Sequence, residues 1–197
     1  MNYLAHAYLS FRNPDWLVGN MISDYVKGKQ KENYPEGIRD GIQLHRFIDT
    51  FTDNHPATQE AKLIFKPEYR LYSGAFVDIV YDHFLATDKN RFTDDGLKDF
   101  AEWVYDTLDP YQHLFPEKFG RMFPYMRKQN WLYNYNAPYG MERSFEGLSR
   151  RALYIKETNT AYQLFKSQYA ALKDCYEAFI DDVESNAKTY SAQFPTY

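Results

Sequence analysis

Apolar residues recur at helical spacing along most of the chain. Between Pro35 and Phe51, for example, Ile38, Ile42 and Ile48 fall on one face of a helix. No segment keeps an alternation of apolar and polar residues bounded by Asn-Gly or Asp-Gly turns, which is the pattern of strands and hairpins. The sequence therefore predicts an all-α fold.

Prolines, glycines and polar runs divide this pattern into separate helices. The spacing predicts helices over residues 2–10, 14–28, 35–51, 57–65, 68–86, 92–108, 141–155 and 160–188. The stretch 111–139, rich in Phe, Tyr and Met, is left open as core, substrate tunnel or interface. Without a repeat or a Gly/Ser linker, 197 residues suit a single helical domain, with catalytic helices over about 1–90 and a C-terminal helical lobe over about 91–197.

Charge and composition exclude several classes of protein. A net charge of −4 does not provide the positive field that binds the phosphates of nucleic acid. The single Cys175 rules out an intramolecular disulfide and favours a reducing, cytoplasmic setting. No stretch approaches the roughly 18 apolar residues of a membrane span, and the first residues lack the basic start of an export signal. The 19 Tyr, 15 Phe and 3 Trp indicate large rings that fill the gaps between helices.

Histidines and carboxylates or amides occur in pairs four residues apart in the first half of the chain. Residues at this spacing share one face of a helix, so each pair can direct two ligands at one point. Four helices that each offer such a pair can enclose a metal ion. The pairs are Asn2 with His6, Asn20 with Asp24, His45 with Asp49, and Asp78 with Asp82.

The segment LHRFIDTFTDNHP carries the clearest polar stripe. His45 and Asp49 lie on one face, and the surrounding phenylalanines indicate a partly buried cavity in which a carboxylate needs a partner or a metal. Asp53 continues the stripe and His55 follows at the helix end. For these two residues an equal alternative is that they satisfy backbone groups where the helix turns.

The segment DIVYDHFLA places Asp78 and Asp82 on one face of a very apolar helix. A divalent cation is the simplest compensation for two such carboxylates. A buried salt bridge to Arg46 or Arg70 is the alternative. His83, about 100° around the helix from its neighbour, is a candidate metal ligand, general acid or base, or donor to a ligating carboxylate.

Asp24 precedes a basic run formed by Lys27, Lys29 and Lys31. A carboxylate ligand beside a basic rim suits a phosphate ester, because the metal polarises a phosphoryl oxygen while lysines attract the anion. Solvated side chains at a helix end are the alternative reading. His6 stands in an apolar first helix, either as a ligand or as a core histidine. Mixed His and Asp ligands suit Mn²⁺, Mg²⁺ or Fe²⁺ better than a structural zinc.

Other catalytic signatures are missing from the sequence. There is no Gly-x-Ser-x-Gly, no phosphate-binding P-loop, no dinucleotide glycine pattern and no His-Glu-x-x-His. Cys175 has no histidine near it in sequence, and His113 lies in the aromatic region, where we expect a structural role. A metal-dependent hydrolase is the chemistry that the remaining residues favour.

Several segments resemble a known family. MNYLAHAYLS, GNMISDYVKG, GIQLHRFIDTFTDNHP and DIVYDHFLA, in this order, resemble successive blocks of the acyl carrier protein phosphodiesterases, and NWLYNY followed by FEGLSRR resembles a later block, so that the resemblance covers about residues 1–155. That family is similar to a variant of the helical HD-type phosphohydrolases. The resemblance implies hydrolysis of the phosphodiester that joins 4′-phosphopantetheine to a serine of holo-acyl carrier protein, with Mn²⁺ and possibly Mg²⁺ or Fe²⁺ as cofactor.

The resemblance also implies site residues. Carried onto matching positions, it gives catalytic roles to Asp24, His45, Asp49 and His83, and metal ligation to His6, Asp24, His45, Asp49, Asp78 and Asp82. Arg46, Lys27 and Lys29 are the expected substrate-binding residues. No consecutive His-Asp pair occurs, only the reversed Asp82-His83, so the ligands cannot be assigned by simple analogy with HD enzymes.

Two other functions stay open from the sequence. One is an HD-like phosphohydrolase acting on a nucleotide or another small phosphoester, and the other is a non-catalytic helical module that binds carrier protein. An acidic carrier protein would be steered by local positive charge. The candidate residues are Lys27, Lys29, Lys31, Arg39, Lys62, Lys66 and Arg70.

Overall fold

The computed structural model describes residues 1–150, 152 and 154–195, and within them every regular element is helical. The prediction of an all-α fold is confirmed. Among these residues no helix is both long enough and apolar enough to span a bilayer. The α-helices are α1 (Tyr3–Tyr8), α2 (Pro14–Ile22), α3 (Glu36–Asn54), α4 (Pro56–Tyr69), α5 (Ser73–Thr87), α6 (Asp94–Leu108), α7 (Glu117–Lys128), α8 (Trp131–Asn134), α9 (Pro138–Ser149), α10 (Asn159–Ser167) and α11 (Tyr169–Ser191). Short 3-10 turns are η1 (Ser23–Tyr25), η2 (Gly28–Asn33), η3 (Arg70–Tyr72) and η4 (Asp109–Leu114).

Several helix ends differ from the predicted ones. The second helix stops at Ile22 and not near residue 28, and the chain continues through η1 and η2. Pro67 lies inside the last turns of α4, and the break before α5 comes at Arg70, whose φ of 48° interrupts the helical backbone. The predicted helix 160–188 is two helices that meet at Gln168, and the helix expected over 141–155 ends at Ser149. Residues 151 and 153 of that segment, and with them the last residue of FEGLSRR, lie outside the described residues.

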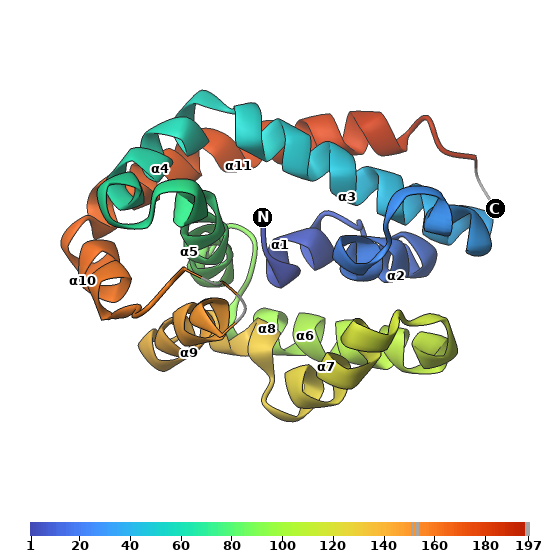
Figure 1. Cartoon of the computed structure of the whole chain (residues 1–197). Coiled ribbons are helices and arrows are strands. Elements are labelled where there is room, and N and C mark those ends of the chain that lie inside the picture. The colour runs from blue at the N-terminus through green and yellow to red at the C-terminus, as the bar shows by residue number, and fades with distance from the viewer. Residues whose placement is uncertain (151, 153, 196–197) are drawn as a thin grey trace.

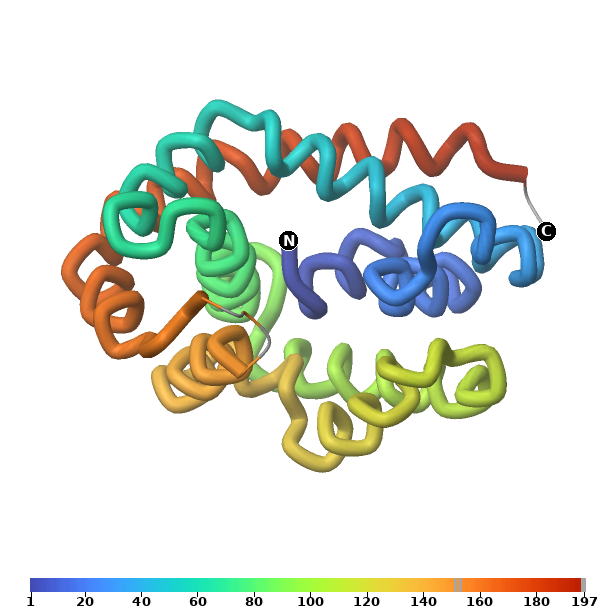
Figure 2. The backbone as a smooth tube through the Cα atoms, viewed as in Figure 1, coloured from blue at the N-terminus to red at the C-terminus, as the bar shows by residue number. Residues whose placement is uncertain are grey.

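The helices are stacked in layers. In Figure 1, α11 runs along α3 at the top, α1 and α2 lie in the middle, and α6 and α7 form the lower layer. α4, α5, α9 and α10 pack together at one end. The chain thus returns at its C-terminal end to cover α3 and α4. Figure 2 shows that the first residue lies in the middle of the molecule, whereas the last helix ends at its edge.

Two glycines allow α2 and α3 to cross at unusually close range. A Cβ added to Gly19 would lie 2.1 Å from the carbonyl oxygen of Ile38, and one added to Gly41 would lie 2.4 Å from that of Trp16. Only residues without a side chain fit at such a backbone contact. The crossing holds Asn20, the neighbour of the first glycine, directly against α3.

Aromatic rings fill much of the interior, as the composition predicts. Phe76 of α5 contacts the rings of Phe65 and Tyr69 from α4 and of Phe145 from α9. The stretch 111–139, left open by the sequence, contributes two helices, and α7 buries Phe119 completely. Part of that stretch is therefore core.

Candidate metal centre

Two histidines and one carboxylate from separate helices meet at the middle of the molecule. His6 comes from α1, and His45 and Asp49 come from one face of α3. The Nε2 atoms of His6 and His45 each lie 3.1 Å from an oxygen of Asp49, and the two imidazole rings are stacked with their centroids 3.9 Å apart. A ligand atom from each of the three residues lies within 4.8 Å of the others. The predicted pair on α3 does direct both side chains to one point.

Asn20 fixes the orientation of both imidazoles. The Nδ1–H of His6 donates to Asn20 Oδ1 at 2.8 Å, and the Nδ1–H of His45 donates to the Asn20 backbone carbonyl at 2.8 Å. The Asn20 amide nitrogen is itself a donor, to the carbonyl of His6 and to Ser10 Oγ. Because both Nδ1 atoms donate to Asn20, Nε2 is the nitrogen of each ring that faces the carboxylates and that could ligate a metal once it is deprotonated.

The charges of the cluster are strongly coupled. Burial alone would lower the pKa of His45, but its hydrogen bonds to Asp24 and Asp49 outweigh that effect and raise the pKa to about 9. Burial and the neighbouring His45 together lower the pKa of His6. Although burial opposes it, the two histidines hold the pKa of Asp49 well below its usual range. His45 therefore carries a proton at neutral pH, and a metal ion that bound to its Nε2 would have to displace that proton.

Asp24 joins the cluster from η1, outside the helices that form it. Its Oδ1 lies 3.2 Å from His45 Nε2, and that hydrogen bond lowers the pKa of Asp24. The histidine side chains are almost completely buried, whereas the side chains of Asp49 and Asp24 are 40% and 65% exposed. The cluster consequently opens to solvent on its carboxylate side.

Asp78 lies at the edge of the cluster. Its Oδ1 accepts a hydrogen bond from the α-amino group of Met1 at 2.9 Å, and the same amino group lies 3.5 Å from Asp49. The partner of Asp78 is therefore this ammonium and not Arg46 or Arg70. Its position leaves Asp78 next to the three central residues without a direct contact to them in the described structure.

Asp82 has a different position from the one expected of a ligand. It is fully buried, and its two oxygens accept the backbone N–H groups of Leu4 at 2.7 Å and Ala5 at 3.1 Å. These groups belong to the first turn of α1, which lacks a capping side chain of its own. Burial raises the pKa of Asp82 to about 7. The residue thus caps and anchors, from α5, the helix that carries His6.

His83 points away from the cluster. Its Nδ1–H donates to the carbonyl of Tyr135 at 2.7 Å, and its Nε2 accepts from the hydroxyl of Tyr169 at 3.1 Å. The ring packs edge-on against Phe165, and burial lowers its pKa. Both nitrogens are used in contacts between helices, so the structure places this candidate catalytic residue apart from the other site residues.

The expected substrate-binding residues are divided by the structure. The Arg46 guanidinium donates to the carbonyl of Val26 at 3.1 Å and so ties the segment after η1 to α3. Lys27 lines a hollow beside Asp24, whereas Lys29 is exposed on η2 and is not part of that lining. Lys118, 94 residues after Asp24 in the chain, also lines the hollow, and no local sequence signal indicated it.

Asp53, which ends the predicted stripe, and His55, which follows it, both have structural partners. His55 Nδ1 accepts the backbone N–H of Ala57 and caps α4, and Asp53 pairs with Lys62 at 2.8 Å. The helix-end alternative therefore describes His55. His113 lies on η4, where its Nδ1 donates to the carbonyl of Pro110, in keeping with the structural role expected of it.

Comparison with known proteins finds one matching family model and several similar sequences. The family model for acyl carrier protein phosphodiesterase matches residues 1–183. The chain is 29% identical to the acyl carrier protein phosphodiesterase of Photorhabdus laumondii over 86% of each chain, and 29% identical to that of an Enterobacter species over 95% of this chain and 98% of the relative. The protein of the same name from Yersinia pestis is 28% identical over 91% of this chain and 93% of its own.

No solved structure shows a significant match to the chain. The family model extends beyond residue 155, where the recognisable sequence blocks end, and reaches into α11, the helix that covers α3. Since that model spans nearly the whole chain, the chain belongs to the acyl carrier protein phosphodiesterase family.

Proposed function

We propose that this protein is a metal-dependent hydrolase that removes 4′-phosphopantetheine from the serine of holo-acyl carrier protein. Membership of the family supports the reaction and the substrate. The observation that carries the metal dependence is the convergence of His6, His45 and Asp49, with both imidazoles fixed so that Nε2 faces the carboxylate.

The ligand atoms of the cluster, two imidazole nitrogens and carboxylate oxygens, fit a divalent ion that accepts both nitrogen and oxygen ligands. Imidazole nitrogen suits the later transition metals, whereas carboxylate oxygen suits Mg²⁺ and Mn²⁺. Two imidazoles and one or two carboxylates therefore favour Mn²⁺ or Fe²⁺ over Mg²⁺, which prefers oxygen alone. A divalent ion bound there supplies polarisation of a phosphoryl oxygen and acidifies water.

The residues of the chain have separable tasks in this proposal. His6, His45 and Asp49 hold the ion, and Asn20 keeps both rings in the ligating tautomer. Asp24, the most exposed carboxylate of the group, orients the attacking water. Water adds its hydroxyl to phosphorus, the bond between phosphorus and the serine oxygen breaks, and that oxygen leaves with a proton, giving apo-carrier protein and 4′-phosphopantetheine.

Two carboxylates on α3 allow a matched test. Asp49→Asn removes a proposed ligand, whereas Asp53→Asn changes an exposed carboxylate one turn further along the same helix, which pairs only with Lys62 among the contacts described. Mass spectrometry of holo-acyl carrier protein incubated with each variant and Mn²⁺ measures the loss of the phosphopantetheine mass. We expect loss with the wild type and Asp53→Asn, and none with Asp49→Asn or a chelator.

Three other outcomes of this experiment would contradict the proposal or favour another function. Full turnover by Asp49→Asn would contradict the proposed metal centre. Metal-dependent cleavage of a small phosphodiester without any on holo-carrier protein would favour a small-molecule phosphohydrolase. Binding of carrier protein without turnover in any metal would favour a binding module.

A further inference from the structure

A hollow of 620 Å³ opens beside the metal centre, between the η1–η2 segment and the start of α7. Asp24 belongs both to its lining and to the cluster, where it hydrogen-bonds to His45. The two walls are about 90 residues apart in sequence. Its lining residues are Asp24, Tyr25, Lys27, Gln30, Asn33, Tyr34, Pro116, Glu117 and Lys118.

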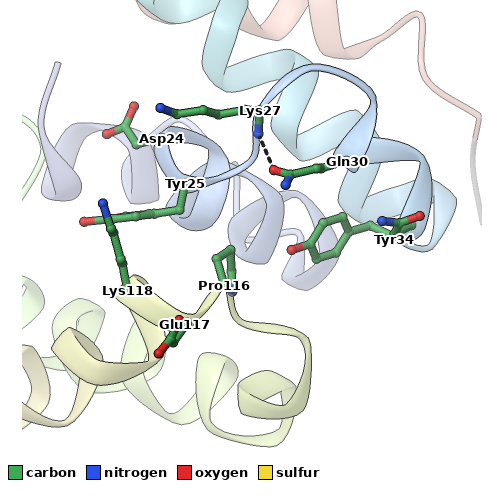
Figure 3. Close-up of a pocket in the computed structure, with 9 residues that line it drawn as sticks. Asp24, Tyr25, Lys27, Gln30, Tyr34, Pro116, Glu117 and Lys118 are labelled. Atoms are coloured by element: carbon green, nitrogen blue, oxygen red, sulfur yellow. Dashed lines mark hydrogen bonds between the residues drawn. The ribbon is translucent and has the colours of Figure 1, made fainter.

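The two ends of the hollow differ in chemistry. Figure 3 shows Lys27 beside Asp24, and Lys118 extending toward the Tyr25 side chain at the same end. This end therefore combines two ammonium groups with the opening of the metal centre. Glu117, the other carboxylate of the lining, is ion-paired with Arg121 on α7, which offsets its charge.

The other end offers amides, a phenol ring and a proline. Gln30 Oε1 accepts the backbone N–H of Lys27 at 2.9 Å, which leaves its Nε2 as a donor for a carbonyl group. Tyr34 and Pro116 provide apolar surface. Asn33, the residue before Tyr34 in the chain, also lines the hollow and adds a second amide. Such a wall matches an uncharged ligand segment that carries amide groups along an aliphatic chain.

We propose that this hollow binds the pantetheine arm of the substrate, with its phosphate between Lys27 and Lys118 and its amides against Gln30 and Asn33. The assignment rests on the proposed function and locates its substrate. The phosphate is the only charge of the arm, and the two lysines lie only at the end of the hollow that adjoins Asp24. An arm laid in this direction has its phosphodiester next to the metal centre and its amides and thiol further along the hollow.

The test measures binding of free 4′-phosphopantetheine by calorimetry in the presence of Mn²⁺. The pocket variants are Lys118→Ala and Asn33→Ala, and the matched control is Lys128→Ala, an exposed lysine at the other end of α7 that does not line the hollow. Loss of a charged hydrogen bond at Lys118 is expected to raise Kd about 10-fold or more, and loss of a neutral one at Asn33 by about 3- to 10-fold. We expect the control to bind as the wild type does. Thermal melts verify that each variant is folded.

Turnover separates this inference from the proposed function. We expect the pocket variants to raise KM for holo-carrier protein, whereas Lys128→Ala, which lies outside the hollow, keeps the wild-type KM and kcat. Wild-type turnover combined with unchanged Kd and KM in both pocket variants would overturn the pocket assignment and leave the proposed function intact. Tighter binding of adenosine monophosphate than of 4′-phosphopantetheine, with the same sensitivity to Lys118→Ala, would also overturn it. No turnover of holo-carrier protein by the wild type would overturn the proposed function, and this inference with it.

Discussion

Replacing Asn20 by alanine tests whether the metal centre depends on a fixed histidine tautomer. The side chain is 1% exposed and makes hydrogen bonds to His6 Nδ1, the His6 carbonyl and Ser10 Oγ. The His6 carbonyl still accepts from the Ser10 hydroxyl at 2.9 Å, so the main buried group left without its acceptor is His6 Nδ1–H.

The magnitude follows from these contacts. An orphaned buried donor costs about 1–3 kcal/mol and the other lost bonds about 1 kcal/mol net, so we expect Asn20→Ala to lower the free energy of unfolding by roughly 2–4 kcal/mol. In a chain of this length that corresponds to a Tm lower by about 4–16 °C. The His6 ring is then also able to carry its hydrogen on Nε2, facing Asp49, where it blocks a metal. Mn²⁺ affinity should therefore fall by about 10- to 100-fold.

The control is Ser10→Ala, which removes two bonds of the same network but leaves the His6 Nδ1–H to Asn20 Oδ1 bond in place. We expect it to lower stability with little change in Mn²⁺ affinity. Calorimetric Mn²⁺ titration and thermal denaturation of both variants give the two readouts. Unchanged Mn²⁺ affinity in Asn20→Ala, despite a lowered Tm, would refute the reasoning about the tautomer.

Four further predictions concern pH, packing and the two residues that do not join the cluster. The pKa of His45 is raised from about 6.5 in the unfolded chain to about 9 in the fold, so protonated His45 stabilises the fold below pH 6.5 and this contribution is lost as the pH rises through 9. The Tm of the protein in chelator should therefore fall between pH 6.5 and 9, and a Tm that did not change with pH would contradict this. Gly41→Ala drives a Cβ into a backbone oxygen of α2 and should cost about 1–3 kcal/mol in urea denaturation, whereas Gly147→Ala, which meets nothing within 4 Å, should be stabilising by about 1 kcal/mol. Asp82→Asn removes one acceptor from the first turn of α1 and should lower the free energy of unfolding by about 1–3 kcal/mol without changing the number of Mn²⁺ ions bound. Loss of bound Mn²⁺ at unchanged stability would instead show that Asp82 is a metal ligand. His83→Gln should lower Tm and leave Mn²⁺ affinity as it is, and a loss of affinity would return this residue to the site.

The central pair of the site could be predicted from sequence because it is a local property. His45 and Asp49 lie four residues apart on one long helix, and that spacing alone places them on one face. His6 joins them through the crossing of helices, which no local pattern encodes. Its own predicted partner, Asn2, instead donates to the hydroxyl of Tyr135.

Asp82 shows why the remaining assignments were beyond the sequence. A carboxylate in an apolar helix must be compensated, and the sequence supports that inference. It does not reveal that the compensation comes from the N–H groups of a different helix, 77 and 78 residues earlier in the chain. The lining of the hollow could not be predicted from the sequence either, because Lys118 reaches it only through the packing of α7.

The all-helical fold class could be predicted from the sequence, whereas the exact ends of the helices could not. Apolar spacing identifies an all-helical chain, because burying one face of each helix dominates its stability. The ends depend on backbone details, such as Arg70 at positive φ three residues after Pro67. Such details are decided by tertiary packing and not by local preference.

The helix that carries His6 has only six residues, too few to be stable in water by itself. An ion held by His6 and His45 would act as a reversible cross-link that closes the intervening chain into a loop, and it would bind the folded arrangement far better than the open one. Metal supply then sets the strength of a tether between the first and third helices. A chelating buffer would remove this tether and leave the N-terminal segment held by its buried side chains and by Asp82. Faster limited proteolysis near residue 10 would then be a gauge of metal occupancy.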